Sequence, residues 1–145
     1  MPGIDTALEL AKLLESRNLD GLQILLADGF AAKGPSMALD KGQTIGFLTV
    51  LFTAFPDHSF GFSDLKEEAG AIRCTALESG THTGVLDLTP FGMPISLPPT
   101  GRRVKLPPSK FTFRVEGDRV TEFAEETAEG GGLAGILAQL GVKTS

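Results

Sequence analysis

The sequence contains no tryptophan, no tyrosine and a single cysteine, Cys74, among its 145 residues. A lone cysteine excludes an internal disulfide framework and a cysteine-rich zinc site. The aromatic residues are ten phenylalanines, so aromatic packing here lacks the hydroxyl and indole groups that form hydrogen bonds. Basic residues are also scarce, with 13 Lys and Arg against 18 Asp and Glu and a net charge of -5. This balance argues against binding to a phosphate backbone, and we expect no nucleic-acid partner.

Long apolar runs are missing as well. The longest extends from Phe47 to Phe55 and is interrupted by two threonines, which is too short to cross a membrane. The first five residues lack the basic segment and the apolar core of a signal peptide. The sequence therefore predicts a cytoplasmic protein without a membrane partner. Its length and its 41% apolar content predict one domain over residues 1–145, with a core and room for a pocket.

Helical spacing of apolar residues comes first, and strand-like alternation follows. Residues 4–15 predict one helix, and Asp followed three positions later by Gln predicts helix starts at Asp20 and Asp40. Pro56 ends the second of these helices. Other segments predict strands at 30–33, 58–67, 71–83, 103–115 and 119–127, and a final helix at 133–140. This order predicts an α+β fold in which helices pack on the concave face of a curved antiparallel sheet and enclose a cavity.

Strand alternation places several polar side chains toward that cavity. One face of the strand at 71–83 carries Ile72, Cys74, Ala76, Glu78, Gly80 and His82. Because this row begins with apolar residues, we expect it to point inward. On the last strand, Phe123, Glu125 and Thr127 share a face. An apolar cavity favours the protonated form of a carboxyl group, which suits Glu125 to acid/base chemistry near neutral pH.

A simpler interpretation of the same strand stays open. Glu122, Glu125, Glu126 and Glu129 form an acidic run that could be a solvated edge. For Glu126 and Glu129 this interpretation is favoured, whereas for Glu125 the two interpretations are balanced.

No cofactor is expected. Residues 130–135 match the pattern G-x-G-x-x-G, but only ten residues follow, which leaves no room for the next strand and the acidic residue of a dinucleotide site. A flexible link to the last helix is the better interpretation. His58 and His82 are too far apart to form a local pair of metal ligands, and we predict no metal.

Four motifs occur in a characteristic order: Phe55-Pro56-Asp57, Gly80-Thr81-His82-Thr83-Gly84, Pro98-Pro99-Thr100-Gly101-Arg102-Arg103-Val104 and Leu137-Ala138-Gln139-Leu140-Gly141. This series resembles the SnoaL-like polyketide cyclase and ester cyclase group of the nuclear transport factor 2-like (cystatin-like cone) superfamily, over roughly the whole chain. The resemblance implies a cone in which the sheet wraps around the N-terminal helices, with a deep hydrophobic pocket. It also implies a homodimer.

The resemblance guides the choice of site residues. In SnoaL-like cyclases the last strand carries Trp and, four positions later, the Asp that serves as acid and base in an aldol ring closure. This chain has Phe123 and Thr127 there, and threonine takes up no proton at neutral pH. His82 is the one pocket residue that transfers directly. We therefore predict Glu125 and His82 as catalytic, and the following as ligand-binding: Phe52, Phe55, Ala76, Glu78, Phe91, Met93, Phe123 and Thr127.

Two of these residues, Phe91 and Met93, lie in the segment 85–97, which is longer than the usual link of the group and could form a lid. Three functions compete. The first is an acid/base cyclase or isomerase that acts on a small hydrophobic carbonyl or polyketide-like compound. The second is a non-catalytic binder of a hydrophobic ligand or a dimeric scaffold. The third is epoxide hydrolysis, which requires an Asp-Arg-Asp set with polar partners such as tyrosine, a residue that this chain lacks.

Overall fold

The computed structural model describes residues 2–34, 38–68, 70–126 and 130–142. The helices are α1 (Pro2–Glu15), α2 (Leu19–Leu25), α3 (Lys41–Ala54), the 3-10 turn η1 (Thr89–Phe91) and α4 (Gly132–Gln139). The strands are β1 (Leu26–Lys33), β2 (Ala38–Asp40), β3 (Ser63–Glu68), β4 (Ala71–Ala76), β5 (Ser79–Thr81), β6 (Leu86–Asp87), β7 (Ser96–Leu97), β8 (Arg103–Lys105), β9 (Ser109–Glu116) and β10 (Arg119–Glu126).

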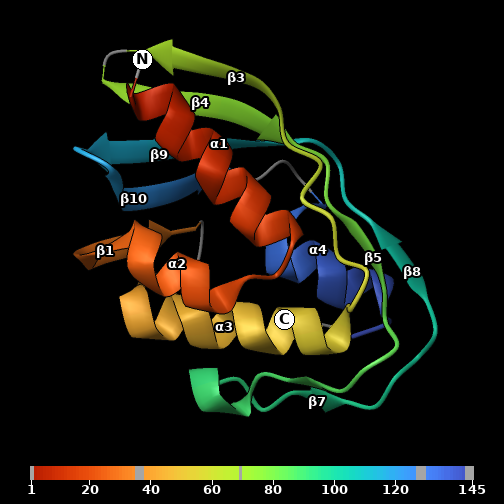
Figure 1. Ribbon diagram of the computed structural model, residues 1–145. Helices are drawn as coiled ribbons and strands as arrows, with labels where there is room; N and C mark the ends of the chain where they lie inside the picture. The colour runs from red at the N-terminus through yellow and green to blue at the C-terminus, as the bar shows by residue number, and fades with distance from the viewer. Residues whose placement is uncertain (1, 35–37, 69, 127–129, 143–145) are drawn as a thin grey trace.

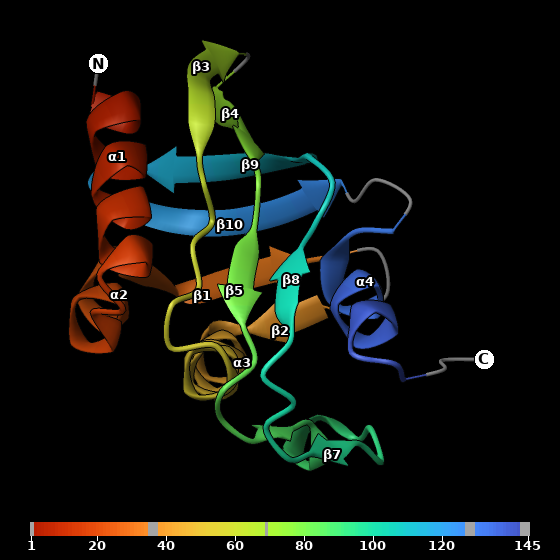
Figure 2. The same ribbon diagram turned by 90° about the vertical axis from the view of Figure 1, so that its right-hand side faces the viewer.

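Six strands form a curved sheet in the order β2-β1-β10-β9-β4-β3 (Figure 1). Strand β1 runs parallel to β10, and all other neighbouring pairs in this sheet are antiparallel. Two short ribbons, β5-β8 and β6-β7, extend from it. Figure 2 shows α1, α3 and α4 arranged around the strands on different sides. The α+β architecture predicted from the sequence is therefore confirmed, with one parallel pair that the alternation pattern did not reveal.

Helices α1 and α3 build the core against the sheet. Helix α1 contacts β3, β4, β9 and β10, whereas α3 contacts β1 and β2. Ala7, Leu10 and Leu14 lie on one side of α1 and are buried, as their spacing predicts. From the sheet, Phe111 and Phe113 on β9 meet them in the same cluster. Cone-like wrapping of the sheet around these helices gives the fold its enclosed interior.

The predicted helices agree with the structure except at one start. Helix α3 begins after Asp40 with a complete capping box, in which Asp40 accepts a hydrogen bond from the Gln43 backbone at 2.8 Å and the Gln43 side chain accepts one from Asp40 at 3.0 Å. The prediction of a cap at Asp20 is wrong. Helix α2 starts two residues earlier, because Asn18 supplies the cap and accepts a hydrogen bond from the Gly21 backbone at 2.8 Å.

Three of the predicted strands were too long, whereas the strand predicted at 30–33 begins earlier, at Leu26, and β2, β6 and β7 were not predicted. The segment 71–83 divides into β4 and β5, and the segment 103–115 divides into β8 and β9 at two prolines, which cannot donate ladder hydrogen bonds. The segment 58–67 becomes regular only at β3, with one isolated bridge between Ser59 and Ser79 before it. The alternation nevertheless persists through the break, because Ile72, Cys74, Ala76, Glu78, Gly80 and His82 are all buried.

Burial also decides the chemistry of Cys74. Its side chain lies in the core, and burial raises the pKa of the thiol to about 11. A thiol with such a pKa stays protonated and is a poor nucleophile at neutral pH. In the described ranges, no helix combines the length and the apolar character that a bilayer crossing requires.

Candidate functional site

A cavity of about 160 Å³ lies between the concave face of the sheet and the helices. Its wall is mostly aliphatic and aromatic, with Leu10 and Leu14 from α1, Phe47 and Leu51 from α3, and Phe111 from β9. Leu133 and Ile136 of α4 close one side. Charged side chains reach this lining at only a few places, of which Glu78 and Glu125 are the carboxylates. A mostly apolar cavity with a few polar groups has the character of a small-molecule site.

Strand β10 places Glu125 in this cavity. Glu125 and Phe123 both line it, as alternation along the strand requires. Opposite Glu125 in the ladder is Phe111, another lining residue, so the carboxylate enters among aromatic rings. Thr127, which the resemblance aligned with the catalytic Asp, lies outside the described residues.

The rest of the acidic run has other partners. Glu126 is exposed and lies 3.7 Å from Arg73. Glu122 forms ion pairs with Lys33 at 2.7 Å and with Arg114 at 3.2 Å. The hydrogen bond from Lys33 is the main cause of the lowered pKa of Glu122. The solvated-edge interpretation thus fits Glu122 and Glu126 but not Glu125. Glu129 lies outside the described residues.

His82 occupies a different place, outside the lining of this cavity as the described residues define it. Its side chain is fully buried and packs against the ring of Phe55, with 5.4 Å between centroids. Its Nδ1 lies 2.9 Å from the hydroxyl oxygen and 3.3 Å from the backbone nitrogen of Thr100, and the tautomer of the ring sets which group donates. Because His82 does not line the cavity, its predicted catalytic role requires a contact with the ligand outside this lining.

Three of the four sequence motifs meet around His82. Its backbone N–H donates to Arg102 at 2.9 Å, and its carbonyl oxygen accepts from Gly101 at 2.7 Å. Beside it, Asp57 accepts a hydrogen bond from the Thr81 backbone at 2.7 Å. This bond is the main cause of the lowered pKa of Asp57. The motifs thus build a structural junction between the end of α3, β5 and the segment before β8.

Protonation of His82 should weaken the fold. Burial lowers the pKa of His82 below its usual value of 6.5. In the unfolded chain the imidazole takes up a proton near pH 6.5, whereas in the folded chain it does so only at lower pH. The His82 contribution to stability is therefore present above pH 6.5 and is lost as pH falls from there through the folded-state pKa.

We expect the urea midpoint of the wild-type protein to fall as the pH is lowered from about 7 to about 5, before most carboxylates titrate. In His82→Gln this part of the pH dependence should shrink, whatever the overall stability of the variant. If the urea midpoint of His82→Gln depends on pH as steeply as that of the wild type between these values, protonation of His82 is not the cause of the dependence.

The other predicted ligand residues fall into two groups. Phe123 and Glu78 line the cavity. Phe52, Phe55 and Ala76 are buried in the core but do not belong to the lining that the described residues form. Phe55 borders the small second hollow beside His58, and the other two pack within the core cluster.

Phe91 and Met93 are also absent from that lining. The segment 85–97 forms β6, η1 and β7 and lies against α3, away from the six-stranded sheet (Figure 2). There, Phe91 contacts Phe47 edge-on at 5.6 Å between centroids. Phe47 itself lines the cavity, so this segment supports the wall from behind.

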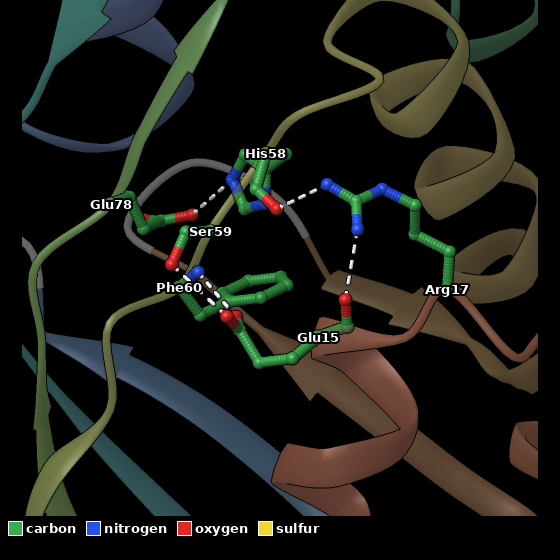
Figure 3. A network of polar contacts seen from close by, with 6 residues as sticks. All are labelled: Glu15, Arg17, His58, Ser59, Phe60 and Glu78. Atoms are coloured by element: carbon green, nitrogen blue, oxygen red, sulfur yellow. Dashed lines mark hydrogen bonds and ion pairs between the residues drawn. The ribbon is translucent and has the colours of Figure 1, made fainter.

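A buried pair that the sequence did not reveal lies at the cavity wall. His58 Nε2 lies 3.2 Å from Glu78 Oε1, and both side chains are buried (Figure 3). The bridge between Ser59 and Ser79 brings the two segments together. In the sequence, His58 stands out only as a weak candidate metal ligand. Its alternation with Phe60 was a usable sign that it points inward, but its partner depends on the tertiary pairing.

The end of α1 holds this pair in place. The carboxylate of Glu15 accepts hydrogen bonds from the Phe60 backbone at 2.6 Å and from the Ser59 hydroxyl at 3.0 Å (Figure 3). The guanidinium of Arg17 donates to the His58 carbonyl at 2.7 Å. Three consecutive residues, 58–60, are thus tied to one helix end. Within the described ranges, no group of three His, Cys, Asp or Glu residues could hold a metal ion.

Comparisons with known proteins agree on the fold. No family model matches the chain, and no curated protein matches it. Among solved structures, a candidate SnoaL-like polyketide cyclase from Jannaschia sp. CCS1 is similar, with a TM-score of 0.72, 22% identity, and coverage of 94% of this chain and 90% of that one. IdmH, a candidate polyketide cyclase from Streptomyces antibioticus, gives a TM-score of 0.71 at 22% identity, covering 98% and 99%.

A third similar structure, a nuclear transport factor 2-like protein of unknown function from Burkholderia pseudomallei, gives a TM-score of 0.71 at 15% identity, covering 96% and 97%. The chain therefore has the nuclear transport factor 2-like fold, a cone of sheet and helices around an interior. Within that fold, the similar structures include candidate polyketide cyclases, one of which is described as SnoaL-like. At these identities the likeness establishes the architecture, and function rests on the site.

Proposed function

We propose that this protein binds a small hydrophobic carbonyl compound in the cavity and catalyses proton transfer on it, as a cyclase or isomerase does. The observation that carries this proposal is the entry of Glu125 and Glu78 into an otherwise mostly apolar cavity. A carboxylate held in a mostly apolar site is an effective general base or acid for a C–H bond next to a carbonyl group. The similar structures that are described as candidate polyketide cyclases support the same class of chemistry.

Glu125 is the proposed proton-transfer group. As a base, its carboxylate removes a proton from the carbon next to the carbonyl, which leaves an enolate. That carbon then attacks a second carbonyl group, which closes a ring, and the new alkoxide takes the proton back from Glu125. In a conjugated enolate, Glu125 instead returns the proton to a different carbon, which gives an isomer. Apolar walls exclude water and strengthen the electrostatic interactions within the site. His82, the second residue that the sequence predicts as catalytic, supports the junction beside the cavity in this scheme rather than the lining.

Non-catalytic ligand binding is the second candidate. The observation in its favour is Thr127, which stands where the resemblance places the catalytic Asp. In that case the same cavity holds a ligand and no product forms. The homodimer that the resemblance implies also stays a proposal, and light scattering coupled to size exclusion would test it.

Binding is the first property to test. A thermal-shift panel of apolar probes, including 2-tetralone, naphthalene and an aromatic lactone, would report occupation of the cavity. A probe at about 100 times its dissociation constant should stabilise the fold by roughly 2.7 kcal/mol and raise the melting temperature. Proton exchange at the carbon next to the carbonyl of 2-tetralone in D2O would then separate a catalyst from a binder. Absence of any shift with all probes would contradict a ligand-binding cavity.

A further inference from the structure

The contact between His58 and Glu78 must contain a hydrogen atom. A carboxylate oxygen and an unprotonated imidazole nitrogen are both acceptors, and two acceptors do not face each other at 3.2 Å in a buried site. The proton therefore sits between Nε2 and Oε1. Only 5% of His58 and 9% of Glu78 are exposed, so water does not replace this bond.

The other nitrogen of His58 indicates which group carries that proton. Nδ1 is buried and has no hydrogen-bond partner among the described residues. A buried N–H without an acceptor is costlier and rarer than a buried acceptor without a donor. The favoured form is thus the neutral imidazole with its hydrogen on Nε2, which donates to Oε1 of a Glu78 carboxylate. This bond uses one oxygen of the carboxylate.

The position of Glu78 leaves its carboxylate available to a ligand. Its side chain lines the cavity, whereas His58 lies behind it in a small separate hollow that Glu78 also borders. The ring of His58 is fixed by Phe60, which meets it edge-on at 4.5 Å between centroids. Gly80 lies close to the same segment, since a Cβ there would come within 3.2 Å of the Phe55 side chain. The pair is therefore a rigid acceptor at the wall of an apolar space.

We infer that Glu78, oriented by His58, accepts a hydrogen bond and then the proton from a hydroxyl or enol group of the ligand. This inference rests on the proposed function and narrows its substrate class to compounds that carry such a group besides the carbonyl. In the step, the ligand O–H bond breaks, its electron pair stays on the ligand oxygen, and a new O–H bond forms on Glu78. The His58 hydrogen bond stabilises the carboxylate before the transfer. His58 acts as a positioning residue because it reaches the ligand only through Glu78.

Bound 2-naphthol tests this directly, since it becomes a strong acid when excited and gives its proton to a nearby acceptor. Emission then comes from naphtholate, whereas without an acceptor in an apolar site it comes from neutral naphthol. We expect naphtholate emission from 2-naphthol bound to the wild-type protein and at least a tenfold lower ratio of naphtholate to naphthol emission in Glu78→Leu. Glu126→Leu, at an exposed glutamate, is the matched control and should match the wild type.

His58 is tested by a pair of variants. Phenylalanine at position 58 has no donor for Glu78, whereas glutamine keeps an N–H group. His58→Phe should lose the naphtholate emission and His58→Gln should recover most of it, which a merely space-filling role for the ring would not produce. Thermal melting verifies that each variant is folded.

The outcomes separate this inference from the proposed function. The probe 2-methoxynaphthalene has the same rings but no acidic hydrogen, and its affinity should change less than about twofold in Glu78→Leu. Naphtholate emission that survives Glu78→Leu but disappears in Glu125→Gln would overturn the role of Glu78 and leave the cavity proposal intact. Failure of both probes to bind the wild-type protein would overturn both proposals.

Discussion

Replacing Glu125 by glutamine should reduce the proton exchange of 2-tetralone by a factor of about 10² to 10⁴, the range that a positioned general base contributes. The amide has nearly the same shape as the carboxylate but takes up no proton at neutral pH. Because Glu125 lies in the lining beside Phe123, the substitution should leave the packing of the wall unchanged. Exchange is followed by proton NMR in D2O and compared with the rate without protein.

Strand β10 provides a control for this experiment. Glu126 is the next residue, is exposed, and lies 3.7 Å from Arg73 rather than in the cavity lining. Glu126→Gln therefore removes the same charge from the same strand without touching the site, and its exchange rate should equal that of the wild type. Equal rates in Glu125→Gln and the wild type would exclude Glu125 as the base. Binding of 2-tetralone without exchange in the wild-type protein would favour the non-catalytic function.

Replacing Gly84 by alanine should destabilise the fold by about 3 kcal/mol, at the upper end of the usual cost of overpacking. A Cβ at Gly84 would overlap the carbonyl oxygen of Thr53, at the end of α3. The same helix end depends on this segment, because the backbone N–H groups of Thr83 and Gly84 both donate to the carbonyl of Ala54, at 3.1 and 3.0 Å. Alanine would push the segment away and leave that carbonyl without its donors.

Gly29 offers a matched substitution in strand β1. Its Cβ position has no heavy atom within 4 Å and its φ is not positive, so Gly29→Ala should change the free energy of unfolding by no more than about 0.5 kcal/mol. For a chain of this length, the loss at Gly84 corresponds to a fall of roughly 10 °C in melting temperature. Similar melting temperatures for the two variants would show that the segment around Gly84 accommodates the added methyl group without loss of stability.

Gly84 also belongs to a sequence motif whose residues serve the packing of the backbone. The pattern Gly80-Thr81-His82-Thr83-Gly84 suggested a pocket residue, His82. In the structure its members bind the backbone of neighbouring segments, as Thr83 and Gly84 do at Ala54. Close backbone approach and buried hydrogen bonds demand specific residues at a structural junction as strongly as chemistry does at a catalytic site.

The sequence by itself determined the class of fold and the direction of several side chains. Helical and strand periodicities are local, so α1, the capping box at Asp40 and the alternation that buries Cys74 could all be predicted from neighbouring residues. The same alternation put Glu125 on one face with Phe123, and the structure shows that both residues line the cavity. Strand lengths were less certain, because an apolar alternation can continue through a break in the ladder, as it does from Ala76 to Ser79.

Only the tertiary structure decided which polar groups meet. The pairing of His58 with Glu78 depends on a bridge between segments 20 residues apart, and the tie from α1 to residues 58–60 spans a still longer separation. The exclusion of His82 from the cavity lining depends on where three motifs converge. Such contacts are set by the packing of whole elements on each other, and local propensity carries no information about them.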